Sequence, residues 1–219
     1  MTQTQIHYEL IRSRRKSVAI YVRDCRVIVR APFIYPVREI DRFVKSKKHW
    51  IEKHLIEQQK QAEHLSEFKL TYGSDILFLG QKYKIVDAEG ISNTFYCPPG
   101  LNETQIRKKL ILFYKDQAGK IIPELINRFA PLIGANPTDV RIGSAKRSWG
   151  SCTSAGRVTF SWRLMMASPE SIEYVVVHEL AHLKQLNHSD KFWAVVARVL
   201  PDWKKRRKEL RILQKNLIL

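Results

Sequence analysis

The sequence is poor in cysteine and contains no long apolar run, and these absences limit the classes of protein it can form. Its three cysteines, Cys25, Cys97 and Cys152, are odd in number and widely separated. They do not predict a disulfide framework and are typical of a reducing compartment. No apolar run approaches the roughly 20 residues that a membrane span needs, and the opening MTQTQIHYEL lacks the segments of a secretory signal. We therefore expect a cytoplasmic protein with no membrane partner.

Acidic residues are also scarce relative to basic ones. The 38 lysines and arginines outnumber the 21 aspartates and glutamates, which gives a formal net charge of +17. A field of this sign attracts polyanions and steers anionic ligands, although a solvated basic surface accounts for it equally well. The chain has no helix-turn-helix, zinc-finger or RNA-binding signature, no P-loop and no dinucleotide fingerprint. Nucleic acid is therefore only a candidate partner, through the basic surface. The basic clusters are Arg12, Arg14, Arg15 and Lys16; Lys45, Lys47 and Lys48; and Lys204, Lys205, Arg206, Arg207 and Lys208.

With 219 residues and 44% hydrophobic side chains, the chain is long and apolar enough to bury a core. Alternating, β-branched segments at residues 6–13 and 17–32 predict two or three strands, with a turn over Arg23–Arg26. Residues 35–60 predict one amphipathic helix with a basic outer face. Strands resume in residues 69–98, where glycines mark the turns. The first part of the sequence is thus rich in strands and contains one long helix.

The segment CPPGLNET, residues 97–104, is the best candidate for a domain boundary, because its two prolines and its glycine interrupt regular structure. Beyond it, residues 103–134 predict one long helix, and residues 139–164 predict two strands joined by a loop of small residues. Residues 168–189 predict a helix with Ser168 as N-cap and a proline at its first position. Two shorter helical segments follow. The sequence therefore predicts two domains, residues 1–97 and 98–219.

One stretch of the second domain, VVVHELAHLKQLNHSDKFW at residues 175–193, carries three of the chain's seven histidines. His178 and His182 are four residues apart, so a helix places both rings on one face, one turn apart. One zinc ion can accept both at about 2.0–2.1 Å. Glu179 lies about 100° around the helix axis from His178. This position keeps it near the metal without displacing a ligand. His-Glu-x-x-His is the pattern of zinc hydrolases, in which the glutamate is a general base toward water that the zinc activates.

A catalytic zinc site with one open position needs a third protein ligand. His188 is the leading candidate, ahead of Asp190 and Glu173. A set of three histidines favours zinc over other divalent metals, although the sequence alone does not prove zinc.

The position of His188 places a condition on the chain. Because His188 is six residues beyond His182, a straight helix would direct it away from the first two rings. The helix must therefore end or bend before His188, and Asn187 best suits a left-handed residue that turns the chain back. Phe192 and Trp193 are expected to pack beneath the His188 loop.

Residues 148–196, SWGSCTSAGRVTFSWRLMMASPESIEYVVVHELAHLKQLNHSDKFWAVV, resemble the signature of the bacterial YgjP-like family of zinc metallopeptidases. The matching pieces are Trp149–Cys152, the strand around Ser161 and Trp162, Pro169, and the segments YVVVHELAHL and NHSDKFW. RFVKSKKHWIEKH, residues 42–54, is similar to the family's N-terminal half, so the resemblance covers nearly the whole chain. It implies a zincin-like catalytic half with three metal ligands and one catalytic base, which are His178, His182, His188 and Glu179.

In zincins an edge strand near the metal binds extended substrate by backbone pairing. The resemblance therefore makes Trp149, Gly150 and Ser151 candidate substrate-binding residues, and the alternative is a tight turn with Trp149 in the core. Cys152 is expected to be an inert thiol, because water that zinc activates already supplies the nucleophile.

The expected fold is α+β, with a β-rich N-terminal half and a zincin-like C-terminal half of helices with a small mixed sheet. The expected function is zinc-dependent hydrolysis of intracellular polypeptide, with Glu179 as general base and one zinc ion as cofactor. One alternative is hydrolysis of a phosphoanhydride, such as that of a nucleotide, by the same site, since the positive charge suits an anionic small-molecule substrate. Another is a nucleic-acid-associated protease, whose binding would weaken steeply with salt. The oligomeric state stays open.

Overall fold

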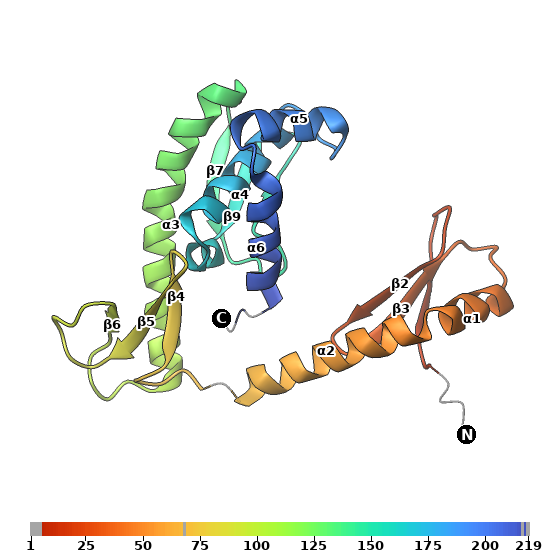
Figure 1. The fold of residues 1–219 in the computed structure, drawn as a ribbon, viewed down its shortest axis with the longest axis horizontal. Coiled ribbons are helices and arrows are strands. Elements are labelled where there is room, and N and C mark those ends of the chain that lie inside the picture. The colour runs from red at the N-terminus through yellow and green to blue at the C-terminus, as the bar shows by residue number, and fades with distance from the viewer. Residues whose placement is uncertain (1–5, 68, 216, 218–219) are drawn as a thin grey trace. The chain divides into compact units, whose positions relative to one another are not determined.

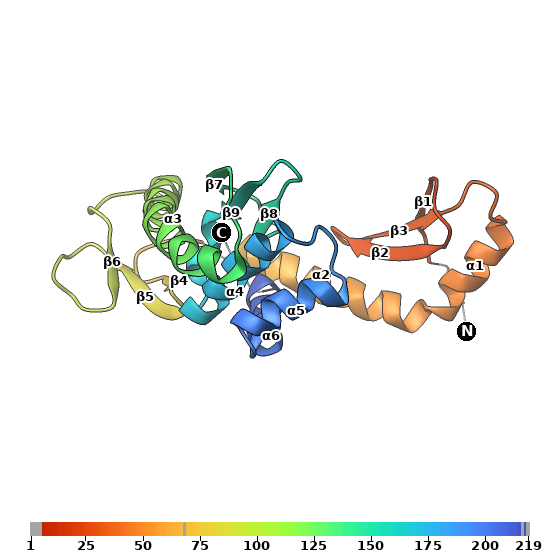
Figure 2. The ribbon, with the colours of Figure 1, turned by 90° about the horizontal axis from the view of Figure 1, so that it is seen from above.

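The computed structural model describes residues 6–67, 69–215 and 217, and it divides into two compact units, Met1–Phe68 and Lys69–Leu219. Each unit combines helices with small sheets (Figures 1 and 2), which confirms the predicted α+β class. The division lies at 68/69, whereas the sequence predicted it at 97/98. The strands that follow residue 69 pack on the long helix of the second unit, as the contacts of Phe113 with Phe78 and Phe95 show.

The first unit contains a three-stranded sheet in the order β1-β3-β2. Strand β3 pairs in parallel with β1 and in antiparallel with β2. The predicted turn is present, because Asp24 and Cys25 both adopt left-handed conformations, with φ of 50° and 57°. Two such residues are typical of the tight hairpin turn that matches the twist of its strands. The strands are β1 (Glu9–Arg12), β2 (Ala19–Arg23) and β3 (Arg26–Ala31).

Two helices complete the first unit where the sequence predicted one. Helix α1 (Val37–Ser46) ends at Lys47, and α2 (Lys48–Glu67) begins at the next residue. The interruption leaves the buried face continuous. The core of this unit consists of Val27, Val29, Ala31, Ile40, Val44 and Ile51.

The second unit opens with a sheet in the order β4-β5-β6, packed on the long helix α3 (Figure 1). Helix α3 (Glu103–Ile133) begins with a capping box, in which Asn102 and Gln105 each accept a hydrogen bond from the other's backbone N–H. It ends at Gly134 in the left-handed conformation, with φ of 68°. The strands are β4 (Asp75–Phe78), β5 (Gln81–Val86) and β6 (Thr94–Tyr96).

A second sheet of this unit, in the order β7-β9-β8, lies beside the helix that carries the metal motif. The sequence predicted two strands here, and the third, β8, falls within the predicted loop. Strand β8 pairs in antiparallel with β9 and forms the sheet's edge. A 3-10 turn, Trp162–Met166, connects β9 to the next helix. The strands are β7 (Asp139–Gly143), β8 (Gly150–Cys152) and β9 (Arg157–Ser161).

Helix α4 (Pro169–His182) begins as predicted, since the Ser168 side chain accepts a hydrogen bond from the backbone N–H of Ser171 at 3.3 Å. Its valines at 175–177 are buried, and it packs against α3, α5, α6 and β8. This helix is therefore the centre of the second unit's core. The last two helices are α5 (Asp190–Val199) and α6 (Trp203–Lys215).

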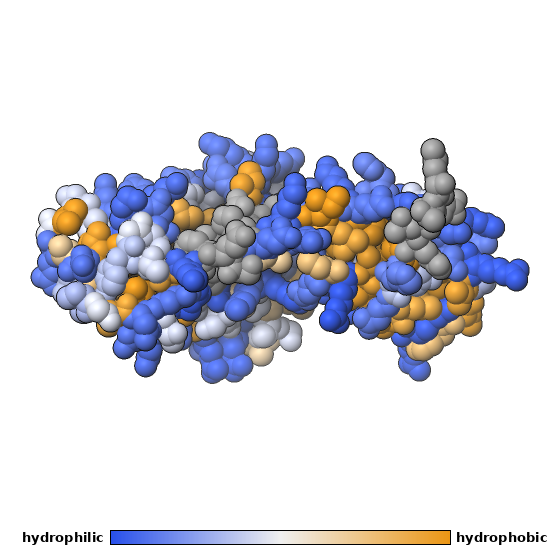
Figure 3. All heavy atoms as spheres, turned by 90° about the horizontal axis from the view of Figure 1, so that it is seen from below, coloured by the Kyte–Doolittle hydropathy of each residue, from blue (hydrophilic) through white to orange (hydrophobic). Residues whose placement is uncertain are grey.

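Hydrophilic side chains cover most of the face drawn in Figure 3, with apolar side chains gathered over parts of the first unit. Within the described part of the chain, none of the helices combines the length and the apolar character that crossing a bilayer requires.

Candidate metal centre

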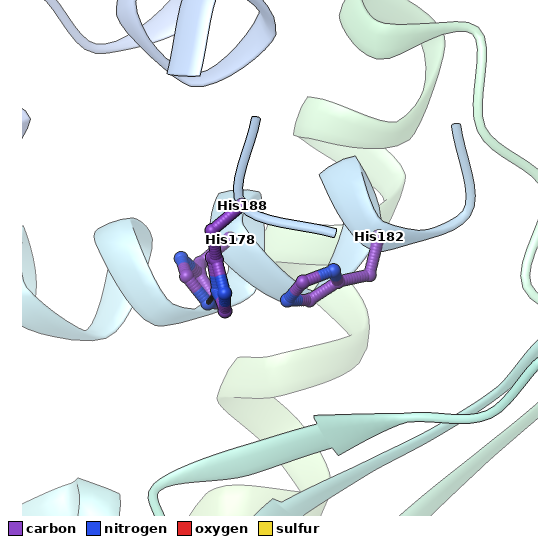
Figure 4. Close-up of side chains that lie close together, drawn as sticks. All are labelled: His178, His182 and His188. Atoms are coloured by element: carbon purple, nitrogen blue, oxygen red, sulfur yellow. Dashed lines mark hydrogen bonds between the residues drawn. The ribbon is translucent and has the colours of Figure 1, made fainter. Parts of the chain in front are cut away.

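Three imidazole rings meet at the end of α4. His178 and His182 lie one helical turn apart, with ring centroids separated by 4.9 Å. The ring of His188, from the loop before α5, lies 5.0 Å from that of His178 and 4.7 Å from that of His182. Figure 4 shows the three rings directed toward one another. One nitrogen from each ring lies within 4.8 Å of the others, so the structure brings all three predicted ligands together.

The nitrogens of these rings suit a tetrahedral metal ion. The Nε2 atoms of His178 and His188 are 3.1 Å apart, and two ligand nitrogens on one tetrahedral zinc ion would be about 3.3 Å apart at bond lengths of about 2.05 Å. On the other side of the rings, Nδ1 of His178 lies 3.4 Å from the Tyr174 hydroxyl and Nδ1 of His182 lies 3.2 Å from the carbonyl of Gln185. Such outer partners fix the ring orientation and leave Nε2 for a metal. The donor set therefore fits zinc.

The path to His188 differs from the prediction. Helix α4 ends at His182, and the backbone N–H groups of Leu183 and Lys184 donate to the carbonyls three residues earlier. Asn187 is not left-handed: the described non-glycine residues with positive φ lie elsewhere in the chain. The prediction for Asn187 was wrong because a tightened last turn, of the 3-10 type, already redirects the chain.

The other two candidate ligands lie outside the cluster. Glu173 forms ion pairs with Arg128 at 3.0 Å and with Arg206 at 2.8 Å, which accounts for its charge without a metal. Asp190 is the first residue of α5, and it is not part of the group of ligands that the described residues bring together.

Aromatic side chains hold the three rings in place. Phe192 is fully buried, and its ring centroid lies 4.5–4.9 Å from those of the three histidines. Trp193 stacks on His188 at 5.5 Å and on Trp203 at 4.2 Å. The prediction that Phe192 and Trp193 pack beneath the His188 loop is confirmed.

Burial sets the charge state of the site. It lowers the pKa of His178 to about 3, with smaller contributions from the other two imidazoles, and it lowers the pKa of His182. Both rings are thus neutral near pH 7, which is the form that binds a metal. Glu179 is 6% exposed, and burial raises its pKa to about 8.

A cavity of about 290 Å³ opens beside the histidines. His178, Glu179 and His188 line it, and so do Trp149 and Gly150. The remaining lining residues were not predicted as site residues from the sequence, although Tyr174 could have been found from its position one helical turn before His178. These residues are Tyr174, Val175, Arg207, Leu210, Arg211 and Gln214.

Gly150 lies directly against the predicted base. A Cβ atom at Gly150 would be 2.7 Å from Cγ of Glu179 and 2.8 Å from its Oε1, so a larger residue would push the carboxylate aside. Trp149 and Gly150 line the cavity as predicted, whereas the exposed Ser151 pairs with Thr159 in the sheet and does not line it. Cys152 follows in β8, and burial together with the charge of Glu179 raises its thiol pKa, which disfavours the nucleophilic thiolate.

Hydrogen bonds fix the loop that leads to Gly150. The Ser161 hydroxyl donates to the carbonyl of Ala145 at 2.7 Å, and the guanidinium of the buried Arg163 donates to the carbonyl of Ser144 at 2.8 Å. The backbone N–H of Ser161 donates to the carbonyl of Trp149 at 2.8 Å. These bonds hold the loop and the start of the edge strand against β9 and the 3-10 turn that precedes α4.

The buried carboxyl makes the stability of the metal-free protein depend on pH. With a pKa of about 8 in the folded chain and 4.5 as its ordinary value, Glu179 is protonated in the folded state and ionised in the unfolded state between these pH values. The unfolded state then binds fewer protons, so stability falls as the pH rises. Glutamine does not ionise, so the stability of the variant Glu179→Gln does not fall with pH for this reason. The variant is expected to exceed the wild type by about 3–5 kcal/mol at pH 8, since the two pKa values differ by more than three units and one unit corresponds to about 1.4 kcal/mol.

Urea denaturation of both proteins with a chelator, at pH 5 and pH 8, measures this difference. The lowered pKa of His178 makes stability rise with pH between about 3 and 6.5 in both proteins, so its contribution cancels. An advantage of the variant that is the same at both pH values would contradict the raised pKa of Glu179.

Comparisons with known proteins bear on this site. The model of a family described as "YgjP-like, metallopeptidase domain" matches residues 16–212. Among solved structures, the chain is similar to the metallopeptidase zymogen of Pyrococcus abyssi abylysin, with 26% identity and a TM-score of 0.41 over 45% of this chain and 100% of that one. It is also similar to the metallopeptidase zymogen of Methanocaldococcus jannaschii jannalysin, with 22% identity and a TM-score of 0.37 over 44% and 97% of the two chains. No curated protein matches the sequence.

Proposed function

Because the chain belongs to the YgjP-like metallopeptidase family, we propose that it is a zinc-dependent peptidase that hydrolyses polypeptide with Glu179 as its general base. The observation that carries this proposal is the convergence of three imidazoles beside a cavity that a buried carboxyl also lines. His178, His182 and His188 would hold the metal. Zinc held by three imidazoles supplies Lewis acidity and a nucleophilic water at neutral pH.

Glu179 is suited to move a proton in this cavity. Its carboxyl makes no hydrogen bond with any other described residue, so it is available to water and to the substrate. Burial raises its pKa to about 8 in the metal-free site, and a metal ion held by the neighbouring histidines would lower it toward the ionised form that accepts a proton. In the proposed reaction the carboxylate takes a proton from the attacking water and delivers it to the leaving nitrogen.

Strand β8 would position the substrate. It forms the edge of the β7-β9-β8 sheet and contacts α4, and Gly150 lies against Glu179. An extended polypeptide that pairs with the free edge of a strand gains backbone hydrogen bonds whatever its sequence. Such pairing would bring a peptide bond close to the Glu179 carboxyl.

A substrate panel tests the proposal. The purified protein is stripped with a chelator, reloaded with one equivalent of zinc, and incubated with casein, a peptide library and nucleoside triphosphates, with Glu179→Gln as the blank. We expect peptide hydrolysis that is lost on stripping, returns on reloading and is lacking in the variant. Hydrolysis of the triphosphates alone would replace the peptidase assignment with a phosphoanhydride hydrolase.

Substitution of Gly150 by alanine is expected to lower kcat/KM for peptides by about 10- to 100-fold while zinc content stays unchanged. The added methyl group would displace the Glu179 carboxylate, and a displacement of about 1 Å in a catalytic group costs on the order of 100-fold. Zinc content by mass spectrometry and peptide hydrolysis measure the two effects.

Gly119 provides the matched control. A Cβ atom there meets no atom within 4 Å apart from the neighbouring backbone of its own helix, and alanine in the interior of α3 would stabilise the helix by about 1 kcal/mol. Gly119→Ala should keep full activity. An equal loss in both variants would show that the contact between Gly150 and Glu179 has no catalytic consequence.

A further inference from the structure

Two arginines of α6 line the cavity of the candidate active site. Arg207 and Arg211 line the same cavity as His178 and Glu179, and Leu210 lies between them in the sequence. Because the two arginines are four residues apart on a helix, their side chains lie on one face, one turn apart. The cavity beside the metal motif thus carries two positive charges.

Neither of these charges is neutralised by the described part of the chain. Arg206, the preceding residue, forms ion pairs with Asp202 at 2.9 Å and with Glu173 at 2.8 Å. Arg207 and Arg211 form no ion pair with any described residue. Like charges one turn apart repel each other on a helix surface, so a bound anion would relieve a repulsion that the chain itself leaves in place.

Aromatic stacking connects Arg207 to the metal motif. Its guanidinium carbon lies 5.1 Å from the centroid of the Trp193 ring, and Trp193 stacks on His188. Stacking of this kind restricts a long side chain, and a restricted guanidinium loses less entropy when it binds a planar anion. Arg207 is half-buried, so its interaction with an anion would also be less screened by water than one at the open surface.

The size of the cavity limits what can occupy it. At about 290 Å³, it lies at the lower limit for ligand pockets, which hold about 300–1,000 Å³. That volume suits one or two side chains of a bound polypeptide. A guanidinium pairs best with a carboxylate or phosphate, through two parallel hydrogen bonds.

We infer that Arg207 and Arg211 form a specificity subsite for a carboxylate of the polypeptide substrate, next to the bond that is cleaved. The inference rests on the proposed peptidase function and adds a substrate class to it. The carboxylate belongs either to an aspartate or glutamate side chain or to the C-terminus of the substrate. In both cases the subsite selects substrates that carry a negative charge near the scissile bond.

Matched peptides test this subsite. They differ only in Glu, Gln or Lys at one position near the scissile bond, and each is made with a free and an amidated C-terminus. The wild type is expected to prefer Glu to Gln by about 10- to 100-fold in kcat/KM, the range for a hydrogen-bonded charge. A preference that follows the free C-terminus and not the side chain would identify the terminal carboxylate as the ligand.

Variants of α6 assign the preference to the arginines. In the double variant Arg207→Gln, Arg211→Gln, the ratio of Glu to Gln peptide should fall below about threefold, and Arg211→Glu should favour the Lys peptide. Lys208→Gln removes one charge from the same helix at an exposed position outside the cavity and should keep the wild-type ratio. Because each ratio is taken within one protein, a partial loss of folding or of zinc does not change it.

A measurement of peptide binding tests this inference independently of the peptidase assignment. The affinity of labelled, uncleaved peptides for zinc-loaded Glu179→Gln, measured by fluorescence anisotropy, should show the same dependence on charge and on the arginines. If no peptide is hydrolysed but this binding persists, the subsite stands and the peptidase assignment fails. The inference is overturned if neutral and acidic peptides bind alike, if the double variant keeps the preference, or if only nucleoside triphosphates bind in a manner that needs the arginines.

Discussion

Replacing Glu179 with glutamine is expected to lower kcat/KM for peptide hydrolysis by about 1,000-fold and to leave zinc binding unchanged. A positioned general base contributes about 10²- to 10⁴-fold to a rate, and glutamine keeps the size of the side chain but cannot accept the proton. Glu179 is buried, and its carboxyl makes no hydrogen bond with any other described residue, so the substitution breaks no contact that supports the fold. Initial rates and zinc content, measured on the same preparation, give both quantities.

Glu170→Gln is the matched control, since Glu170 is exposed in the first turn of the same helix. Its loss affects only the interaction with the helix dipole, about 0.3–1 kcal/mol of stability, and activity should be unchanged. Turnover by Glu179→Gln at the wild-type rate would remove Glu179 from the mechanism. A joint loss of zinc and activity would place its role in the metal site.

The metal motif could be predicted from the sequence because its spacing is a local property of one helix. His178 and His182 need only helical geometry to share a face, and Ser168 and Pro169 define where that helix starts. His188 was predicted because a catalytic zinc site needs a third protein ligand. The backbone conformation between His182 and His188 was not predicted correctly. A left-handed Asn187 was the simplest way to reverse the chain, whereas the structure uses a tightened turn after His182.

Strand β8 shows why part of the site could not be predicted. Its three residues, Gly-Ser-Cys, have no β-branched or aromatic member, and such a stretch between strands is typical of a loop. It is a strand because it pairs with β9. The sequence of a three-residue segment does not reveal such a partner. The role of Gly150 is likewise invisible in sequence, because it depends on the approach of Glu179 from a different element.

Helix α6 itself was predicted, but the roles of its arginines, like the break between α1 and α2, could not be predicted from the sequence. The basic residues of α6 point all round, so no periodicity separates the paired Arg206 from Arg207 and Arg211 at the cavity. In the first unit, Ile40, Val44 and Ile51 fall within about 40° of one another on a 100° helical repeat, and all three are buried. The hydrophobic pattern is therefore the same with or without the interruption at Lys47.

Replacing His188 with glutamine is expected to weaken zinc binding by more than about 100-fold. Loss of an outer partner of a metal ligand already costs about 10- to 100-fold, and His188 is one of the three rings whose nitrogens converge. His188 is exposed and lies outside the helices, so the variant should fold, which makes this the cleanest test among the three histidines. Competition with a chromophoric chelator at pH 7 measures the affinity.

Thermal or urea unfolding gives a second readout of the same change. At a free zinc concentration 100 times the wild-type Kd, zinc stabilises the folded wild type by about 2.7 kcal/mol, and a 100-fold weaker site retains only about 0.4 kcal/mol. His49→Gln, at an exposed position of α2 in the first unit, should keep the full stabilisation. If His188→Gln kept it as well, the third ligand would be another residue, and the neighbouring Asp190 would be the first to replace. The convergence of the three rings would then reflect packing around Phe192 alone, because that side chain contacts each of them.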